Sequence, residues 1–531
     1  MQRLDIYDTT LRDGCQAEGV AFSVNDKLRV AKRLDDIGVA YIEGGWPNET
    51  NPSDREFFQR AADMRWENAK IAAFGSTRMA KNAPEDDAIL QELLEAKSPV
   101  VTIFGKAWDL HATEVLRVSL DENIEIIRSS VEYLKAHVDE VIFDAEHFFD
   151  GYRADAEFAI DCLRAAVEAG ADALVLCDTN GGSLPDWIAA ITESVGDTFD
   201  DTTLGIHCHN DSGLAVANSM AAVEAGCTQV QGTINGYGER CGNANLCTMI
   251  PNFELKMQRP CLPEGKLADL KDLAAFTDEI ANLPHNQRQP YVGRSAFAHK
   301  GGMHVNAVLK NAETFEHISP ELVGNTRRIL VSDYSGTSTV AHKLQQIWSD
   351  IDRSDPLVSQ VLQQVKELEK RGYEFEAADA TFELLARRLR DGLEPPFDLH
   401  GYRVTVGKQD ENSEPYSEAT IKVSVDDNGD DLPREVHTAA EGTGPVDALD
   451  NALRKALGEL FPKLNELSLT DYKVRVLRGD EGTSAAVRVL VQTTNGEESW
   501  GTVSVHENII EASWQAVIDS IIYGLIKNGD V

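Results

Sequence analysis

The stretch Thr203–Asp211, TLGIHCHND, places two histidines one residue apart at the end of an apolar run. Alternate residues of a β-strand point to the same face, so His207 and His209 project together while Cys208 points to the other side. Two imidazoles held in this way form half of a divalent-metal site, or else a pair of buried, hydrogen-bonded histidines. The choice between the two depends on the rest of the chain.

Strand-like segments of this kind recur through the first half of the chain and alternate with helical patterns. Seven steps of roughly 32 residues lead from Leu4 to Gln229, which suits a (β/α)8 barrel of about 250 residues. A doubly wound α/β sheet is the alternative, but eight regular units without a Gly-rich dinucleotide turn favour a TIM barrel. The expected strands are LDIYDTT (4–10), VAYIEGGWP (39–47), KIAAFGST (70–77), VVTIFGKAW (100–108), EVIFDAEHF (140–148), ALVLCDTNG (173–181), TLGIHCHND (203–211) and QVQGTINGYG (229–238).

Seven polar residues fall at or just beyond the C-terminal ends of these strands. Barrel active sites are built at that end, so the clustering favours a catalytic site, whereas structural polar residues would be scattered over both ends. The glycines of INGYGERCGN (234–243) lack dinucleotide-binding spacing and predict a tight loop instead. The seven residues are Arg12, Asp13, Glu146, Thr179, His207, His209 and Asn243.

The bulk properties of the 531-residue chain exclude several classes of partner. Its formal net charge of -38 argues against nucleic acid and anionic membranes. The apolar stretch at residues 509–526 is broken by Glu511 and Asp519, and we interpret it as too amphipathic to span a bilayer. Eight cysteines without a CxxC pair, and a first strand that begins at about Leu4, predict a cytoplasmic protein with no signal peptide.

The second half of the chain predicts two further parts. Helical patterns at 355–372 and 378–392 precede a boundary at Pro395-Pro396. Beyond it, segments 418–457 and 485–525 repeat one pattern of strands, a turn (DDNG and TTNG), another strand and an amphipathic helix. The expected domains are a barrel at 1–275, a helical linking subdomain at 276–396 and a C-terminal α+β domain with an internal repeat at 397–531.

Three motifs together carry a resemblance to a known family. IYDTTLRDG (6–14), the HxH strand and INGYGERCGN resemble the acyl-CoA/2-oxo acid condensing enzymes, which include isopropylmalate, homocitrate and citramalate synthases. EGGWPNETNP (43–52) and FDAEHFFDGY (143–152) look most like the citramalate synthase branch. The duplicated C-terminal part resembles the family's regulatory domain, which binds an end-product amino acid. A plain dimerisation module is the alternative.

The resemblance implies a metal site and a set of catalytic groups. Asp13, His207 and His209 would bind a divalent cation, with Asn243 as a fourth or water-bridged ligand, and this donor set suits Mg²⁺, Mn²⁺ or Zn²⁺. Arg12 would stabilise a developing oxyanion, unless it forms a salt bridge with Glu43 or Asp8. Glu146 would orient the reacting groups. Thr179 would donate a hydrogen bond to the oxo-acid carboxylate, unless its hydroxyl is already hydrogen-bonded within the protein at the end of its strand.

The proton-abstracting base is expected downstream of the barrel. His304 matches the histidine that, in this family, reaches the barrel mouth from the partner subunit, and His299 is the weaker candidate. Two positions depart from the wider family. Cys15 replaces a glutamate, and Trp46 replaces a smaller aromatic residue, which favours a small substrate if Trp46 faces the site and does not merely cover the rim.

The resemblance therefore implies a metal-dependent acyltransferase that condenses acetyl-CoA with pyruvate and water to citramalate and CoA, at the entry to isoleucine biosynthesis. Rival hypotheses are isopropylmalate or homocitrate synthesis from another 2-oxo acid, a lyase or aldolase, and a non-catalytic paralogue. A homodimer and an isoleucine or leucine effector are further expectations.

Overall fold

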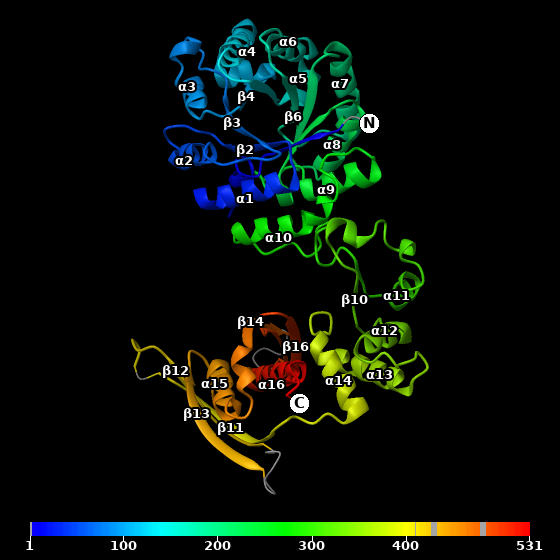
Figure 1. Ribbon diagram of the computed structural model, residues 1–531. Coiled ribbons are helices and arrows are strands. Elements are labelled where there is room, and N and C mark those ends of the chain that lie inside the picture. Colours follow the sequence, from blue (N-terminus) through cyan, green and yellow to red (C-terminus); the bar gives the residue numbers. More distant parts are fainter. Residues whose placement is uncertain (1–2, 409, 426–432, 478–484, 531) are drawn as a thin grey trace. The chain divides into compact units, whose positions relative to one another are not determined.

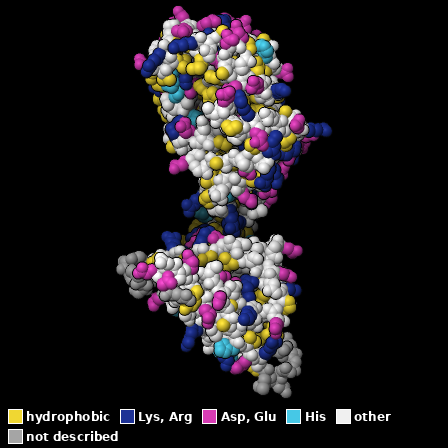
Figure 2. Space-filling view, turned by 90° about the vertical axis from the view of Figure 1, so that its left-hand side faces the viewer, with side chains coloured by type: hydrophobic (Ala, Val, Ile, Leu, Met, Phe, Trp, Pro, Cys, Tyr) yellow, Lys and Arg dark blue, Asp and Glu magenta, His cyan; other side chains and the backbone are white. Residues whose placement is uncertain are grey.

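The computed structural model describes residues 3–408, 410–425, 433–477 and 485–530. The chain divides into two compact units, Met1–Phe297 with Ile318–Thr326, and Ala298–His317 with Arg327–Val531. The expected DDNG turn at 426–429 lies outside the described residues. Acidic and basic side chains are interspersed over the visible face of both units (Figure 2).

The first unit is a closed barrel of eight parallel strands, as the alternating patterns predict (Figure 1). β1 and β8 pair in register from Asp5 to Asp8, which closes the barrel. The strands are β1 (Asp5–Asp8), β2 (Tyr41–Gly45), β3 (Lys70–Ser76), β4 (Val100–Lys106), β5 (Glu140–Glu146), β6 (Ala173–Asp178), β7 (Thr203–Cys208) and β8 (Gln229–Gly232).

Helices surround the barrel and bury its outer face. The first helix shows why they form where they do: Ser23 and Asp26 make a reciprocal capping box, and Gly38 ends the helix with a φ of 97°. The helices are α1 (Val24–Ile37), α2 (Pro52–Ala61), α3 (Ala88–Glu95), α4 (Leu120–Lys135), α5 (Phe148–Ala154), α6 (Ala156–Glu168), α7 (Pro185–Thr198), α8 (Ala215–Glu224), α9 (Leu246–Pro251) and α10 (Leu270–Ile280).

The barrel has two separate apolar cores. The larger one lies between strands and helices, and a smaller one fills the interior with Tyr7, Tyr41, Val100 and Ile142 among others. Strand residues are therefore buried on both faces, which is why these strands are apolar nearly throughout. The interior is filled in this way below the C-terminal rim, and a cavity lined by polar side chains opens at that rim.

The second unit begins with a small helical part. Strands β9 (Ala298–His299) and β10 (Arg328–Ile329) pair in parallel, and the helices are α11 (Gly302–Val308), α12 (Thr337–Ile347), α13 (Pro356–Lys370) and α14 (Asp379–Asp391). α12, α13 and α14 share one apolar core.

The rest of the second unit is the duplicated module. Each half is a three-stranded antiparallel sheet followed by a helix, so each half has one more strand, at its start, than the repeat in the sequence indicates. The first half contains β11 (Asp398–Gly407), β12 (Tyr416–Val425), β13 (Arg434–Gly442) and α15 (Pro445–Leu457). The second contains β14 (Ser468–Val476), β15 (Val487–Thr494), β16 (Ser499–His506) and α16 (Ile509–Asn528).

The last helix, α16, covers the segment that the sequence predicts to be too amphipathic to span a bilayer, and it is more apolar than that prediction implies. By length and composition it is the single described helix that could cross a membrane, but 72% of its apolar window is buried in the unit. Its buried side chains belong to one apolar core, which also contains side chains of α15 and of strands from both sheets. Such burial is typical of a core helix, so its composition is weak evidence for a membrane span.

Candidate active site

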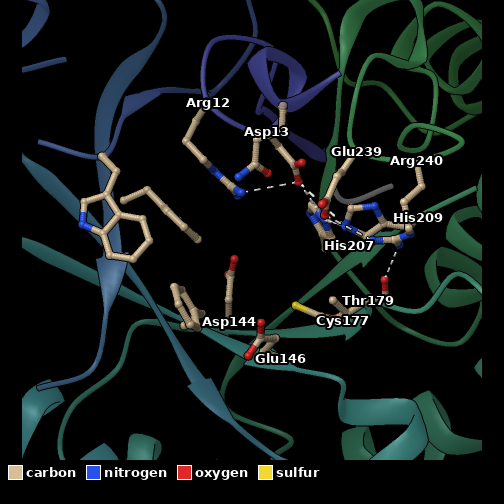
Figure 3. Close-up of a pocket in the computed structure, with 14 residues that line it drawn as sticks. Arg12, Asp13, Asp144, Glu146, Cys177, Thr179, His207, His209, Glu239 and Arg240 are labelled. Carbon is tan, nitrogen blue, oxygen red and sulfur yellow. Dashed lines mark hydrogen bonds and ion pairs between the residues drawn. The ribbon is translucent and has the colours of Figure 1, made fainter. Parts of the chain in front are cut away.

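A cavity of about 230 Å³ lies at the C-terminal ends of the barrel strands (Figure 3). All but one of the seven rim residues that the sequence indicates line it, and Asn243 lies beside it, paired with His209 through an isolated β-bridge. The lining residues are Arg12, Asp13, Gln16, Trp46, Phe74, Phe104, Asp144, Glu146, Cys177, Thr179, His207, His209, Glu239 and Arg240.

Asp13 and the two histidines of β7 converge on one point. Nε2 of His207 lies 3.3 Å from Oδ2 of Asp13, Nε2 of His209 lies 3.9 Å from the same oxygen, and the two Nε2 atoms are 3.3 Å apart. Figure 3 shows the Asp13 carboxylate pointing at both rings from the loop after β1. These three residues are the single described cluster whose ligand atoms could hold a metal ion.

Buried polar atoms around this point lack partners within the described chain. Oδ1 of Asp13 and both amide atoms of Asn243 are buried without a hydrogen bond, although such atoms are nearly always satisfied in proteins. Gly238 has a φ of 156°, and a Cβ there would lie 3.0 Å from Oδ1 of Asn243. Asn243 thus carries an unsatisfied amide on the residue that is bridged to His209, and the carboxylate and two imidazoles form a donor set that fits a divalent cation.

The electrostatics of the cluster favour the metal-binding form of Asp13 and His209, whereas for His207 the effect of burial is outweighed by Asp13, which raises the pKa of that imidazole. Burial raises the pKa of Asp13, but Arg12 and His207 outweigh it and hold that pKa well below its usual range. Burial, with the neighbouring His207, lowers the pKa of His209 to about 3. A carboxylate and a neutral imidazole are the protonation states that a metal requires.

Arg12 forms the salt bridge that was the alternative to a catalytic role. Its Nε donates to Oε2 of Glu43 at 2.6 Å, and its guanidinium lies 3.7 Å above the Phe74 ring. Both contacts orient Arg12 at the cavity wall. Asp8, in contrast, accepts hydrogen bonds from the main chain and hydroxyl of Thr10 and shapes the loop that carries Arg12.

Glu146 and Thr179 lie at the ends of β5 and β6. Glu146 forms an ion pair with Lys106, a cation that the sequence analysis missed. The Thr179 hydroxyl oxygen accepts a hydrogen bond from the main-chain N–H of His147 at 2.9 Å, which leaves the hydroxyl proton free to donate. The His147 ring packs against His111 with ring centroids 4.2 Å apart, and it does not line the cavity.

Two further polar residues of the site carried no motif in the sequence. Gln231 of β8 joins Nδ1 of His207 to the carboxylate of Asp144. Burial raises the pKa of Asp144 to about 7, and nearby Glu43 adds to the effect while His207 opposes it. Both side chains project from predicted strands into the barrel. The alternation of inward and outward positions along each strand was therefore the one feature of the sequence that could have identified them as site residues.

Three aromatic rings form the opposite wall of the cavity. Trp46, Phe74 and Phe104 pack with ring centroids 5.5 to 5.9 Å apart. Trp46 thus faces the cavity and does not merely cover the rim, and Phe104 lines the cavity beside it. Cys15 does not: its thiol donates to the Leu11 carbonyl, and burial raises its pKa to about 11.

The two candidate bases belong to the second unit. The exposed His304 ring stacks on Phe315 at 4.2 Å and lines a separate cavity with Tyr334. His299 Nε2 lies 3.0 Å from Oε1 of Glu316. The barrel cavity itself is lined by first-unit residues, so the catalytic roles of both histidines stay predictions.

The class of protein follows from comparison with known families. Residues 3–276 match the HMGL-like family, residues 291–373 the homocitrate synthase post-HMGL domain, and residues 376–525 the LeuA allosteric (dimerisation) domain. The chain belongs to the HMGL-like family, as its barrel and motifs predict.

The relatives narrow this class. The chain is 54% identical to the (R)-citramalate synthase of Aquifex aeolicus (strain VF5), over 99% of this chain and 98% of the relative. It is 52% identical to that of Geobacter sulfurreducens, over 100% and 99%. The 2-isopropylmalate synthase of Shouchella clausii is 32% identical over 98% and 96%. The resemblance to the citramalate branch is thereby confirmed.

Proposed function

We propose that the chain joins acetyl-CoA to pyruvate and water, giving (R)-citramalate and free CoA, at the entry to isoleucine biosynthesis. The observation that carries the proposal is the convergence of Asp13, His207 and His209 inside the barrel cavity. Full-length identity of 54% and 52% to two (R)-citramalate synthases supports it.

Asp13, His207 and His209 would hold a divalent cation, with Asn243 as a fourth or water-bridged ligand. The partnerless oxygens of Asp13 and Asn243 support this set. A cation at that position would supply Lewis acidity to the keto carbonyl of the oxo acid. The mixed oxygen and nitrogen donors suit Mg²⁺, Mn²⁺ or Zn²⁺.

Arg12 and Thr179 would bind and orient the oxo acid. The Arg12 guanidinium faces the cavity and carries a fixed charge, so it can stabilise negative charge that develops on a reacting oxygen. The free hydroxyl proton of Thr179 can donate to the substrate carboxylate.

The reaction needs one proton removed and one delivered. A base takes a proton from the acetyl methyl group, that carbon bonds to the keto carbon of pyruvate, and the keto oxygen gains a proton. Water then cleaves the C–S bond to give the second carboxylate and the CoA thiol. Glu146, held by Lys106, would orient the reacting groups, and His304 is our candidate base.

Release of CoA with a panel of 2-oxo acids tests the function. We expect metal-dependent thiol release with pyruvate, and a product that chiral chromatography identifies as (R)-citramalate. Faster release with 2-oxoisovalerate or 2-oxoglutarate would instead identify an isopropylmalate or homocitrate synthase. No release with any acid would leave a lyase, an aldolase or a non-catalytic paralogue.

We infer the remaining properties from the second unit and the cysteines. The match of residues 376–525 to the LeuA domain supports a homodimer and feedback by isoleucine or leucine. All eight cysteines are free, which supports a reducing cytoplasm.

A further inference from the structure

A buried ion pair lies next to the part of the cavity wall that Trp46 forms. Nζ of Lys27, on α1, lies 2.5 Å from Oδ1 of Asp54, on α2, and the two side chains are only 6% and 7% exposed. Lys27 is the single buried lysine in the described part of the chain, and lysine is almost never buried without a partner. A buried ion pair adds little net stability, so its contacts are the better guide to its role.

The pair contacts the main chain at the end of β2. Nζ of Lys27 donates to the carbonyl oxygen of Gly44 at 3.1 Å, and Oδ2 of Asp54 accepts a hydrogen bond from the main-chain N–H of Trp46 at 2.8 Å. Both helices pack against β2 (Figure 1). Lys27 and Asp54 therefore hold the strand end on either side of Gly45, although neither of them lines the cavity.

Gly45 allows the Asp54 carboxylate to come this close. Its φ is 147°, and a Cβ at this position would overlap the carboxylate. Asn51 donates to the same oxygen, Oδ2, at 2.7 Å, so this oxygen accepts from a loop side chain as well as from Trp46. The chain after β2 is thus folded around one buried carboxylate.

The position of Trp46 limits the space for a substrate. Its indole packs on Phe74 and Phe104 with ring centroids 5.9 and 5.8 Å apart, and all three rings line a cavity of only about 230 Å³. In a cavity of this size, a small displacement of a bulky ring decides whether added methyl groups overlap the wall. Whatever fixes the main chain of Trp46 therefore influences which oxo acid fits.

We propose that Lys27 and Asp54 are positioning residues that hold Trp46 in place and thereby restrict the enzyme to 2-oxo acids with a methyl substituent. They act through the main chain at the end of β2 and touch neither the substrate nor the reacting atoms. The proposal rests on the acyl-transfer function proposed above, and it adds the residues that set the substrate range of that reaction.

Two double variants that differ only at position 54 test this role. Removal of one partner would leave a buried charge unpaired and could unfold the chain, so both charges are removed together. Lys27→Met/Asp54→Asn keeps an oxygen that can accept from the Trp46 N–H, whereas Lys27→Met/Asp54→Leu has a similar shape and no acceptor. We expect the ratio of kcat/KM for pyruvate to kcat/KM for 2-oxoisovalerate to stay within about threefold of the wild type in the first variant. It should fall at least tenfold in the second.

The same substitutions in a Trp46→Ala background show whether the effect passes through Trp46. There, Lys27→Met/Asp54→Leu should change the ratio by less than about twofold, because coupled residues are not additive. A merely structural role would lower kcat/KM for both acids alike and leave the ratio unchanged. Lys70→Met/Glu140→Gln is the matched control, since it removes an ion pair at the N-terminal ends of β3 and β5. It should not change the ratio.

Equal ratios in the wild type and in folded Lys27→Met/Asp54→Leu would overturn the proposal, and so would a tenfold fall that persists in the Trp46→Ala background. If thermal melting shows that the leucine variant does not fold, Gly45→Ala tests the same contact, because its methyl group would displace the Asp54 carboxylate. Gly45→Ala should also lower the ratio at least tenfold, and an unchanged ratio would contradict the positioning role.

Failure of the proposed function has a different signature. A wild type that prefers 2-oxoisovalerate contradicts the proposed substrate, whereas the positioning role is measured by the change of the ratio between variants. If the wild type releases no CoA with any oxo acid, crystal structures of the two double variants decide. An indole of Trp46 that is displaced only in Lys27→Met/Asp54→Leu supports the positioning role, and an indole in the same place in both variants overturns it.

Discussion

Gln231 determines which nitrogen of His207 faces Asp13. Oε1 of Gln231 lies 2.9 Å from Nδ1 of His207, while its amide nitrogen donates to Asp144 at 3.2 Å. An amide oxygen only accepts, so Nδ1 carries the proton and Nε2 remains as the ligand atom next to Asp13. Gln231 therefore positions a candidate metal ligand that belongs to the neighbouring strand.

Replacing Gln231 by leucine should weaken metal binding without unfolding the barrel. Loss of such a supporting hydrogen bond typically costs about 10- to 100-fold in metal affinity, and calorimetry with Mn²⁺ or Zn²⁺ measures it. Gln229→Leu is the control, because Gln229 lies at the start of the same strand and its side-chain oxygen has no hydrogen-bond partner. Equal affinities in Gln231→Leu and the wild type would contradict the positioning role.

Removing either histidine should abolish the metal site. His207→Ala or His209→Ala leaves at most two of the three converging ligands, so both turnover and metal affinity should be lost while circular dichroism stays unchanged. His137→Ala, at an exposed helix end, serves as the control. Full activity in either variant, or after exhaustive chelation, would rule out the metal site.

Asp8 should make the barrel less stable as pH rises. Burial raises its pKa to about 7, only partly offset by hydrogen bonds from Thr10, whereas the unfolded chain releases this proton near pH 4. Between about pH 4 and pH 7, folding therefore takes up a proton. The free energy of unfolding falls as pH rises through this range. From pH 5 to 7 the loss is on the order of 2 kcal/mol.

Urea unfolding of the wild type and Asp8→Asn at pH 5 and pH 8 checks this. The asparagine cannot ionise, so the stability difference should shift in its favour by about 2 kcal/mol at the higher pH. A difference that is the same at both pH values would show that Asp8 does not titrate in this window.

Removal of the chain from about Asp398 onward should abolish amino-acid feedback. Ala380 and Leu384 of α14 share a core with the C-terminal sheets, so we expect the truncated chain to be less stable as well. CoA release with and without isoleucine or leucine, together with calorimetry, measures the response. If the full-length chain binds neither amino acid, the C-terminal module is structural only.

The aromatic wall should select pyruvate over larger oxo acids. Trp46 and Phe104 narrow the cavity. Steric overlap of these rings with the isopropyl group of 2-oxoisovalerate costs more free energy than the smaller methyl group of pyruvate loses in contacts. We expect kcat/KM for pyruvate to exceed that for 2-oxoisovalerate by at least roughly 100-fold, and Trp46→Ala or Phe104→Ala to narrow the ratio. Steady-state kinetics with both acids measure this ratio. A higher kcat/KM for 2-oxoisovalerate than for pyruvate would contradict the proposed substrate.

Local patterns in the sequence were enough for the barrel and for most of its rim. A strand buried on both faces is a short apolar run, and all eight such runs became strands. Because parallel strands of a barrel end on one rim, the residues that follow them, such as Asp13, Thr179 and His209, had to approach one another. The extra first strand of each C-terminal repeat was missed: its side chains are mostly exposed, and its apolar alternation is limited to three residues, Tyr402, Val404 and Val406 in one half and Tyr472, Val474 and Val476 in the other.

Tertiary structure alone decided the partners of these residues. The pair of Glu43 with Arg12 joins β2 to the loop after β1. The pairs of Lys106 with Glu146 and of Gln231 with His207 each join two neighbouring strands. Such pairs depend on barrel closure and strand register, which bring together residues 24 to 40 positions apart and leave no periodic trace in the sequence. The sequence by itself thus determined the fold and the metal-ligand candidates, and the closed barrel determined their hydrogen bonds and protonation states.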